Sequence, residues 1–139
     1  MKRISLKGVA VGNIVDIVSS SIVGFLVAIY VLMSSAASVK DMDAANQFVL
    51  ASGVFWFWST ILGSLGSVLG GYIAARIARQ DDVLNGALSS ILCVGVTVYA
   101  LVSGGAAGHE ALYLVSLPLS PALTAFGGYL SARQRGRPR

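Results

Sequence analysis

Four long apolar stretches, separated by short polar segments, dominate the pattern of this chain. They cover residues 8–33, 54–75, 84–103 and 111–132. Each has about 20 residues or more, the length that an α-helix needs to cross a hydrocarbon core of about 30 Å. The pattern therefore predicts an all-α membrane protein, a bundle of four transmembrane helices that forms one domain over residues 1–139.

The basic residues favour one orientation of these spans. Of the ten Lys and Arg residues, only Lys40 lies in a loop on the side opposite to the termini. The other nine flank the spans on the side of the termini: Lys2, Arg3, Lys7, Arg76, Arg79, Arg133, Arg135, Arg137 and Arg139. Because basic flanking residues are retained in the cytoplasm, this distribution predicts that both termini are cytoplasmic.

Composition supports a membrane protein and argues against a nucleic-acid-binding one. The chain is 55% hydrophobic and 12% charged, against about 25% charged in soluble domains. Its net charge of +4 is concentrated beside the spans, without interleaved aromatic residues. We interpret this charge as a topology signal, and the arginine-rich C-terminal tail as a candidate contact for anionic lipid.

The aromatic residues agree with the predicted span boundaries. Tyr and Trp prefer the headgroup level of a bilayer. Five fall near predicted outer ends and two near inner ends: Tyr30, Trp56, Trp58, Tyr99 and Tyr113, and Tyr72 and Tyr129. We expect these seven residues to anchor the helices at the interfaces.

A short sequence occurs twice, 57 residues apart. The stretch GGYIAAR ends the second span at Arg76, and GGYLSAR ends the fourth at Arg133. Duplication of a helix hairpin would produce a parallel two-hairpin repeat. Convergence is the alternative, because paired glycines allow close packing, Tyr anchors at the interface and Arg ends a span.

Residues 70–91, GGYIAARIARQDDVLNGALSSI, provide a family resemblance. They resemble the pattern GGY-x-A-x-R…L-[HN]-G-[AL]-L of small four-span bacterial membrane proteins that have no assigned activity. This chain has Asn85 where such proteins often have His. The resemblance implies a location in a bacterial inner membrane and implies no catalytic or binding residues.

Small residues recur at four-residue spacing within the spans, and such rows allow membrane helices to approach closely. Two adjacent rows lie on the second span, and we expect them to pack against the first. The helix-packing candidates are Gly8, Gly12 and Gly24 in the first span, Gly63, Gly66, Ser67, Gly70 and Gly71 in the second, and Gly127 and Gly128 in the fourth. The same rows could form the interface of a homo-oligomer or contact a membrane-protein partner.

Asp16 is the only acidic residue within a span. It lies about 12 Å along the helix from Gly8, between the inner edge and the midplane of the bilayer. Together with Asn13 and Ser20 it could join helices through hydrogen bonds, or it could pair with Arg76 or Arg133. Since intramembrane carboxylates often serve transport, a proton or ion site is the third hypothesis.

Nothing in the spans indicates catalysis. They contain no His, and His109-Glu110 lacks the second His of a zinc-protease motif. We therefore expect no enzyme activity, no metal site and no cofactor. The predicted function is that of a small structural or accessory membrane protein acting through helix–helix packing. A dimeric proton-coupled transporter using Asp16 and a holin-like pore former are the alternatives.

Overall fold

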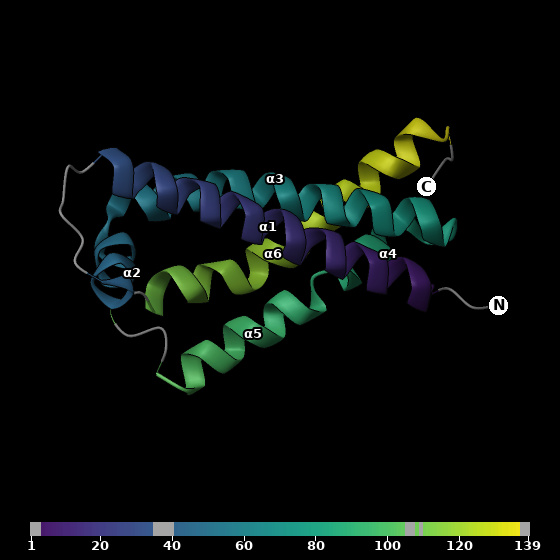
Figure 1. Cartoon of the computed structure of the whole chain (residues 1–139). Helices are drawn as coiled ribbons and strands as arrows, with labels where there is room; N and C mark the ends of the chain where they lie inside the picture. The colour runs from purple at the N-terminus through teal and green to yellow at the C-terminus, as the bar shows by residue number, and fades with distance from the viewer. Residues whose placement is uncertain (1–3, 35–40, 105–107, 109, 137–139) are drawn as a thin grey trace.

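The computed structural model describes residues 4–34, 41–104, 108 and 110–136, and within these ranges it contains six helices and no strand. The helices are α1 (Leu6–Ser34), α2 (Met42–Ala51), α3 (Gly53–Ala78), α4 (Asp82–Leu88), α5 (Ile91–Val102) and α6 (Glu110–Gln134). Figure 1 shows α1, α3 and α6 as the long helices of the bundle, with α5 along one side.

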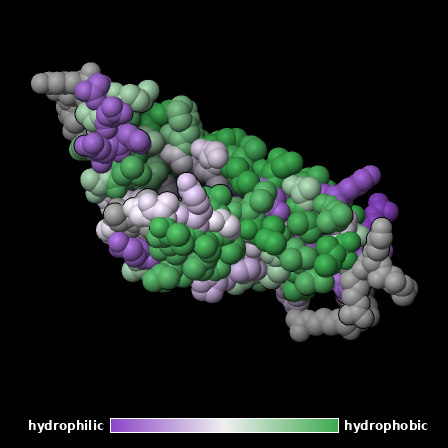
Figure 2. Space-filling model, turned by 90° about the horizontal axis from the view of Figure 1, so that it is seen from below, coloured by the Kyte–Doolittle hydropathy of each residue, from purple (hydrophilic) through white to green (hydrophobic). Residues whose placement is uncertain are grey.

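Four helical segments of the described chain are long and apolar enough to cross a membrane. They are Leu6–Ser34, Gly53–Ala78, Asp82–Val102 and Glu110–Gln134, the third of which comprises α4 and α5. Figure 2 shows hydrophobic residues over the middle of one face and hydrophilic residues toward its two ends. The prediction of an all-helical fold with four segments able to span a membrane is confirmed for the described residues.

The start of α1 and the end of α6 lie at the same end of the bundle. The connection between α3 and α4 lies at this end too, while α2 lies at the opposite end (Figure 1). The described basic residues Lys7, Arg76, Arg79, Arg133 and Arg135 belong to these helix ends and this connection. We call this end of the molecule the basic end.

The predicted loop that contains Lys40 is followed by a helix, α2, before α3 begins. Residues 35–40 lie outside the described part of the chain, but residues 42–46 belong to α2. The Asp41 carboxylate caps this helix by accepting a hydrogen bond of 2.7 Å from the N–H of Ala44. Ser52 then ends α2, and its hydroxyl caps α3. The Asp41 cap pairs a free N–H in the first turn of α2 and so favours a helix in this short segment.

The third span is broken, although its sequence predicts one helix over residues 84–103. The hydroxyls of Ser89 and Ser90 donate to the carbonyls of Gly86 and Ala87, at 2.7 and 2.8 Å. Serine hydroxyls that bind the preceding turn compete with regular helical hydrogen bonding. At these two serines the helix stops at Leu88 and restarts as α5.

The glycine rows bring α1 and α3 into close contact. A Cβ added at Gly8 would lie 2.6 Å from the carbonyl oxygen of Ala74, and one at Gly12 would lie 2.6 Å from the Cβ of Ala74. A Cβ at Gly70 would lie 2.8 Å from the carbonyl oxygen of Gly12, and one at Gly66 would lie 2.7 Å from a serine hydroxyl of α1. Side chains at these positions would force the two helices apart.

Two members of the predicted rows do not pack against another helix. A Cβ at Gly24 or Gly63 would meet no atom within 4 Å in the described part of the chain. Four residues turn an α-helix by about 400°, so such a row rotates by about 40° at each step. At Gly24 and Gly63 the rows have consequently rotated away from the contact between α1 and α3.

The two copies of the GGY sequence meet where α3 packs against α6. A Cβ at Gly71 would overlap the backbone of Thr124, and one at Gly127 would overlap the backbone of Val68. At the basic end, the hydroxyl of Tyr72 donates to the side chain of Gln134 at 2.6 Å. Each of the two helices thus has a glycine at the contact, and the backbone of the other helix occupies the space that a side chain would need.

At the basic end, Arg135 joins three helices. Its Nη2 donates to the carbonyl oxygen of Ala75 at the end of α3, at 2.7 Å, and to the hydroxyl of Ser131 at 2.8 Å. The same nitrogen lies 3.5 Å from Oδ1 of Asp82, whose side chain is 4% exposed. Arg135 therefore supplies the positive charge next to a buried carboxylate.

This arrangement predicts strong coupling between Arg135 and Asp82. We expect Arg135→Gln alone to lower the free energy of unfolding by about 1–3 kcal/mol, since it leaves a buried carboxylate unpaired. Adding Asp82→Asn should recover part of this loss. Thermal unfolding in detergent measures the effect, with the exposed Arg133→Gln as the matched control. Additive losses in the double variant would contradict the pairing.

Candidate functional site

Asp16 lies on α1 where this helix meets α3 and α5, and its side chain is completely buried. The hydroxyl of Ser67, on α3, donates to Oδ1 of Asp16 at 2.8 Å. The thiol of Cys93, on α5, lies 3.3 Å from Oδ2, and the hydroxyl of Ser20 lies 3.5 Å from Oδ1. The carboxyl group therefore connects three spans through hydroxyl and thiol donors.

Close packing surrounds this carboxyl group. A Cβ added at Gly70 would lie 2.9 Å from the Cβ of Asp16, so α3 can approach only because this position is glycine. Two pockets of the described chain lie elsewhere, one beside Lys7 and the other beside Tyr30 and Trp58. Asp16 lines neither of them.

Asn13 supports the break between α4 and α5. In a continuous helix the N–H of Leu92 would donate to the carbonyl of Leu88. Here it donates to Oδ1 of Asn13 at 3.2 Å. The amide group of Asn13 also donates to the carbonyl of Val9, and the residue is 2% exposed. Asn13 thus satisfies a backbone donor that the break would otherwise leave unpaired within the apolar region.

The two arginines predicted as partners of Asp16 lie at the basic end. Arg76 lies over the ring of Tyr72, 5.7 Å from its centroid, and donates to the hydroxyl of this tyrosine. Arg133 is exposed on α6. Within the described part of the chain neither forms an ion pair with Asp16, whose oxygens accept from Ser67 and Cys93.

The predicted interface residues lie toward the ends of their helices. Tyr30, Trp58 and Tyr99 are 60%, 44% and 72% exposed, as expected of side chains that face lipid headgroups. Trp56 and Tyr113 pack edge to face with centroids 6.3 Å apart. Tyr129 is half-buried and packs against Phe126 on α6. The aromatic residues therefore also join α3 and α6.

Asn85 is the important polar residue that the sequence reasoning passed over. It is completely buried, and its Oδ1 accepts a hydrogen bond of 2.8 Å from the N–H of Ser5. Its Nδ2 donates to the carbonyls of Gln80 and Asp81, at 2.7 and 3.1 Å. Asn85 therefore fastens the start of α1 to the connection between α3 and α4. The only sequence signal for Asn85 was its place in residues 84–86, Leu-Asn-Gly, of the family pattern.

The arrangement around Asp16 provides hydrogen bonds between helices and lacks the features of a metal centre. Within the described residues, no group of three or more His, Cys, Asp or Glu side chains could hold a metal ion. The thiol and hydroxyl donors suit a carboxyl group held between packed helices.

No family model, curated protein or solved structure matches the chain.

Proposed function

We propose that this chain is a small structural or accessory protein of a bacterial inner membrane, acting through helix–helix packing, with both termini in the cytoplasm. The observation that carries the proposal is the complete burial of Asp16 among donors from α1, α3 and α5. A carboxyl group held in a packed seam strengthens a bundle without requiring a path for a transported ion. The distribution of Lys and Arg supports the orientation.

The strongest alternative is a proton-coupled transporter using Asp16. It is favoured by the break between α4 and α5, since discontinuous helices recur at the binding sites of transporters. The break lies beside Asn13, one helical turn from Asp16. Against it, Asn13 satisfies the freed N–H of Leu92, and the side chain of Asp16 is completely buried.

A flux measurement distinguishes these functions. We expect vesicles reconstituted with the full chain to conduct protons no faster than protein-free vesicles at any imposed pH gradient. Asp16→Asn should fold and change thermal stability by no more than about 0.6 kcal/mol, the average value of one interhelical hydrogen bond in a membrane. Proton flux in the wild type that disappears in a stably folded Asp16→Asn variant would establish the transporter instead.

The same vesicles test the pore-forming alternative. A holin-like protein would release an encapsulated fluorescent dye, whereas a packed bundle should retain it. Release that rises steeply with the protein-to-lipid ratio would contradict the proposed function and favour a pore of several copies.

A further inference from the structure

The pocket beside Tyr30 and Trp58 is a groove of about 290 Å³ between α1 and α3. Its lining consists of Leu26, Val27 and Tyr30 from α1 and Trp58 and Leu62 from α3. These residues lie toward the end of α1 and the start of α3, and hence toward the end opposite the basic end. We call this pocket the α1–α3 groove. Asp16 does not line it, and the proposed packing function assigns it no role.

The fold fixes the shape of this groove. Val27 is 7% exposed and forms a hydrophobic cluster with Val31 and with Val49 of α2, against which Leu62 packs. Nearer to the basic end, Gly66 keeps α3 close to α1, since a Cβ there would lie 2.7 Å from a serine hydroxyl of α1. Because all these contacts lie within the chain, the groove exists before any ligand occupies it.

Aromatic and aliphatic residues follow the same order on both walls of the groove. On α1, Tyr30 lies one helical turn nearer than Leu26 to the end opposite the basic end. On α3, Trp58 lies one turn nearer than Leu62 to the same end. The groove therefore has two amphipathic rings toward one end and hydrocarbon toward the other.

The two rings carry donors that the chain does not use. Tyr30 has a phenol O–H and Trp58 an indole N–H. Within the described residues neither donates to another group of the protein, whereas the indole N–H of Trp56 donates to the carbonyl of Leu50 at 2.8 Å. Both donors are therefore available to acceptor oxygens of a ligand.

The depth of the groove in a bilayer indicates what this ligand is. Tyr30 lies 23 residues after Lys7, and Trp58 lies 18 residues before Arg76. At 1.5 Å per residue these separations are about 35 Å and about 27 Å along the helices, close to the hydrocarbon thickness of about 30 Å. The two donors thus lie at the level of headgroups and ester groups, and the aliphatic part of the groove lies at the level of acyl chains.

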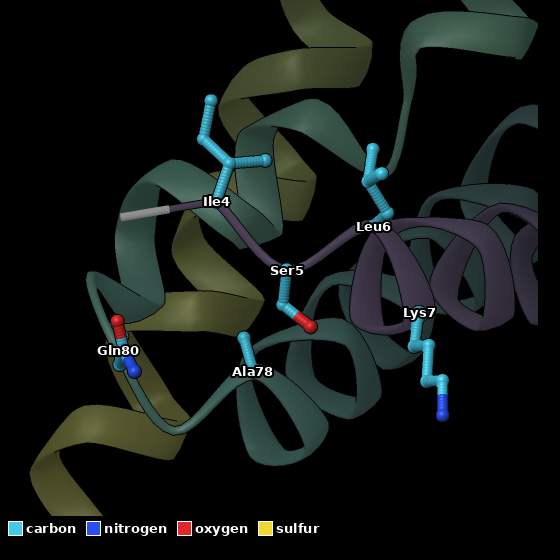
Figure 3. A pocket seen from close by; sticks show the side chains of 6 residues that line it. All are labelled: Ile4, Ser5, Leu6, Lys7, Ala78 and Gln80. Atoms are coloured by element: carbon cyan, nitrogen blue, oxygen red, sulfur yellow. The ribbon is translucent and has the colours of Figure 1, made fainter. Parts of the chain in front are cut away.

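The pocket at the basic end lacks this order. Figure 3 shows the side chains of Ile4 and Leu6 on the side of their segment that faces away from Lys7 and Gln80. The charged group and these apolar side chains do not face a common ligand, so we assign none to this pocket.

We propose that the α1–α3 groove binds one phospholipid, with an acyl chain along Leu26, Val27 and Leu62. Tyr30 and Trp58 donate to the ester or phosphate oxygens of the same lipid. Because no charged residue lines the groove, binding does not depend on the charge of the headgroup. The inference is independent of the role of Asp16 and of the charge of the C-terminal tail.

Native mass spectrometry of the full chain in detergent tests the site, with phosphatidylglycerol and phosphatidylcholine as probes. The wild type should retain one lipid of either kind. Leu26→Trp places a larger ring in the groove at a position that is 59% exposed, and it should abolish this retention. The matched control, Leu65→Trp, makes the same change at an exposed leucine outside the groove and should retain the lipid.

A second pair of variants tests the donors. Tyr30→Phe removes the hydroxyl and keeps the ring, so it should weaken the binding of both lipids roughly 2- to 10-fold, the effect of one hydrogen bond. Tyr99→Phe makes the same change at an exposed tyrosine of α5 and should bind as the wild type does. Unchanged binding by Tyr30→Phe would contradict the assignment of this donor.

Three outcomes would overturn the lipid site. Equal losses in Leu26→Trp and Leu65→Trp would attribute binding to unspecific contact over the whole apolar surface. A strong preference for phosphatidylglycerol would assign binding to the basic end. A wild-type dimer that Leu26→Trp converts to a monomer would identify a second copy of the chain as the occupant of the groove. Thermal unfolding of each variant serves as the folding control.

Discussion

Replacing Gly71 by alanine is expected to destabilise the bundle by about 1–3 kcal/mol, the usual cost of overpacking. A Cβ at this position would overlap the carbonyl oxygen, the carbonyl carbon and the Cα of Thr124. Because these are backbone atoms, they cannot rotate away, and α6 must move as a whole. Thermal unfolding in detergent should therefore show a clear decrease in the midpoint temperature.

The matched control is Gly63→Ala, which makes the same change on the same helix. Nothing lies within 4 Å of a Cβ at Gly63. Alanine is favoured over glycine inside a helix by about 0.5–1 kcal/mol, so this variant should be neutral or slightly more stable. Equal effects of the two substitutions would mean that α3 and α6 do not pack through Gly71.

Replacing Asn85 by alanine is expected to have an effect of similar size. The substitution leaves the N–H of Ser5 and the carbonyls of Gln80 and Asp81 without the Asn85 side chain. The carbonyl of Asp81 keeps the backbone N–H of residue 85, whereas the N–H of Ser5 and the carbonyl of Gln80 lose this partner, and the loss of a partner by a buried polar group costs about 1–3 kcal/mol. Thermal unfolding measures the loss, and hydrogen exchange should show faster opening at the start of α1.

Two further variants make this experiment specific. Asn46→Ala removes the same side chain from an exposed position on α2 and should change stability little. Asn85→Asp keeps the acceptor for Ser5 but places a buried carboxylate oxygen against the carbonyl oxygens of Gln80 and Asp81, so it should be at least as destabilising as Asn85→Ala. An Asn85→Ala protein as stable as Asn46→Ala would show that the hydrogen bonds of Asn85 between the start of α1 and the connection of α3 to α4 do not stabilise the fold.

Hydrophobic patterning was sufficient to predict the four spans, because the bilayer requires about 20 consecutive apolar residues whatever the neighbours are. Four-residue spacing also predicted the close approach of α1 and α3 at Gly12 and Gly70. The same spacing did not predict where the rows rotate away from the contact between α1 and α3. At Gly24 and Gly63 the outcome depends on how the helices cross, which is a property of the whole bundle.

The break in the third span illustrates what patterning alone does not reveal. Residues 84–103 are predominantly apolar, and their mean hydropathy does not separate α4 from α5. At the break, the hydroxyls of Ser89 and Ser90 bind the preceding turn, and Asn13, which lies 79 positions before Leu92, accepts the freed N–H. A hydrogen bond between residues so distant in sequence becomes predictable only once the packing of α1 against α5 is known.

The partners of Asp16 show the same limit. Its burial within a small-residue row was predictable from spacing, and a positive partner was a reasonable expectation for a carboxyl group in a membrane. The structure supplies Ser67 and Cys93 instead. Cys93 is the only cysteine of the chain, and a thiol in an apolar span offers no sequence signal that identifies it as a donor.

This cysteine also makes the central claim testable, because its sulfur lies 3.3 Å from Asp16 and reports whether water reaches the carboxyl group. The measurement is labelling by a charged, membrane-impermeant maleimide in open membrane fragments, which expose both faces. Cys93→Ser combined with Ser103→Cys, at the exposed end of α5, is the positive control and should label rapidly. A packed seam predicts that Cys93 itself labels only after denaturation in detergent. Rapid labelling of Cys93 in the folded protein would show a water-filled path to Asp16 and contradict the structural role.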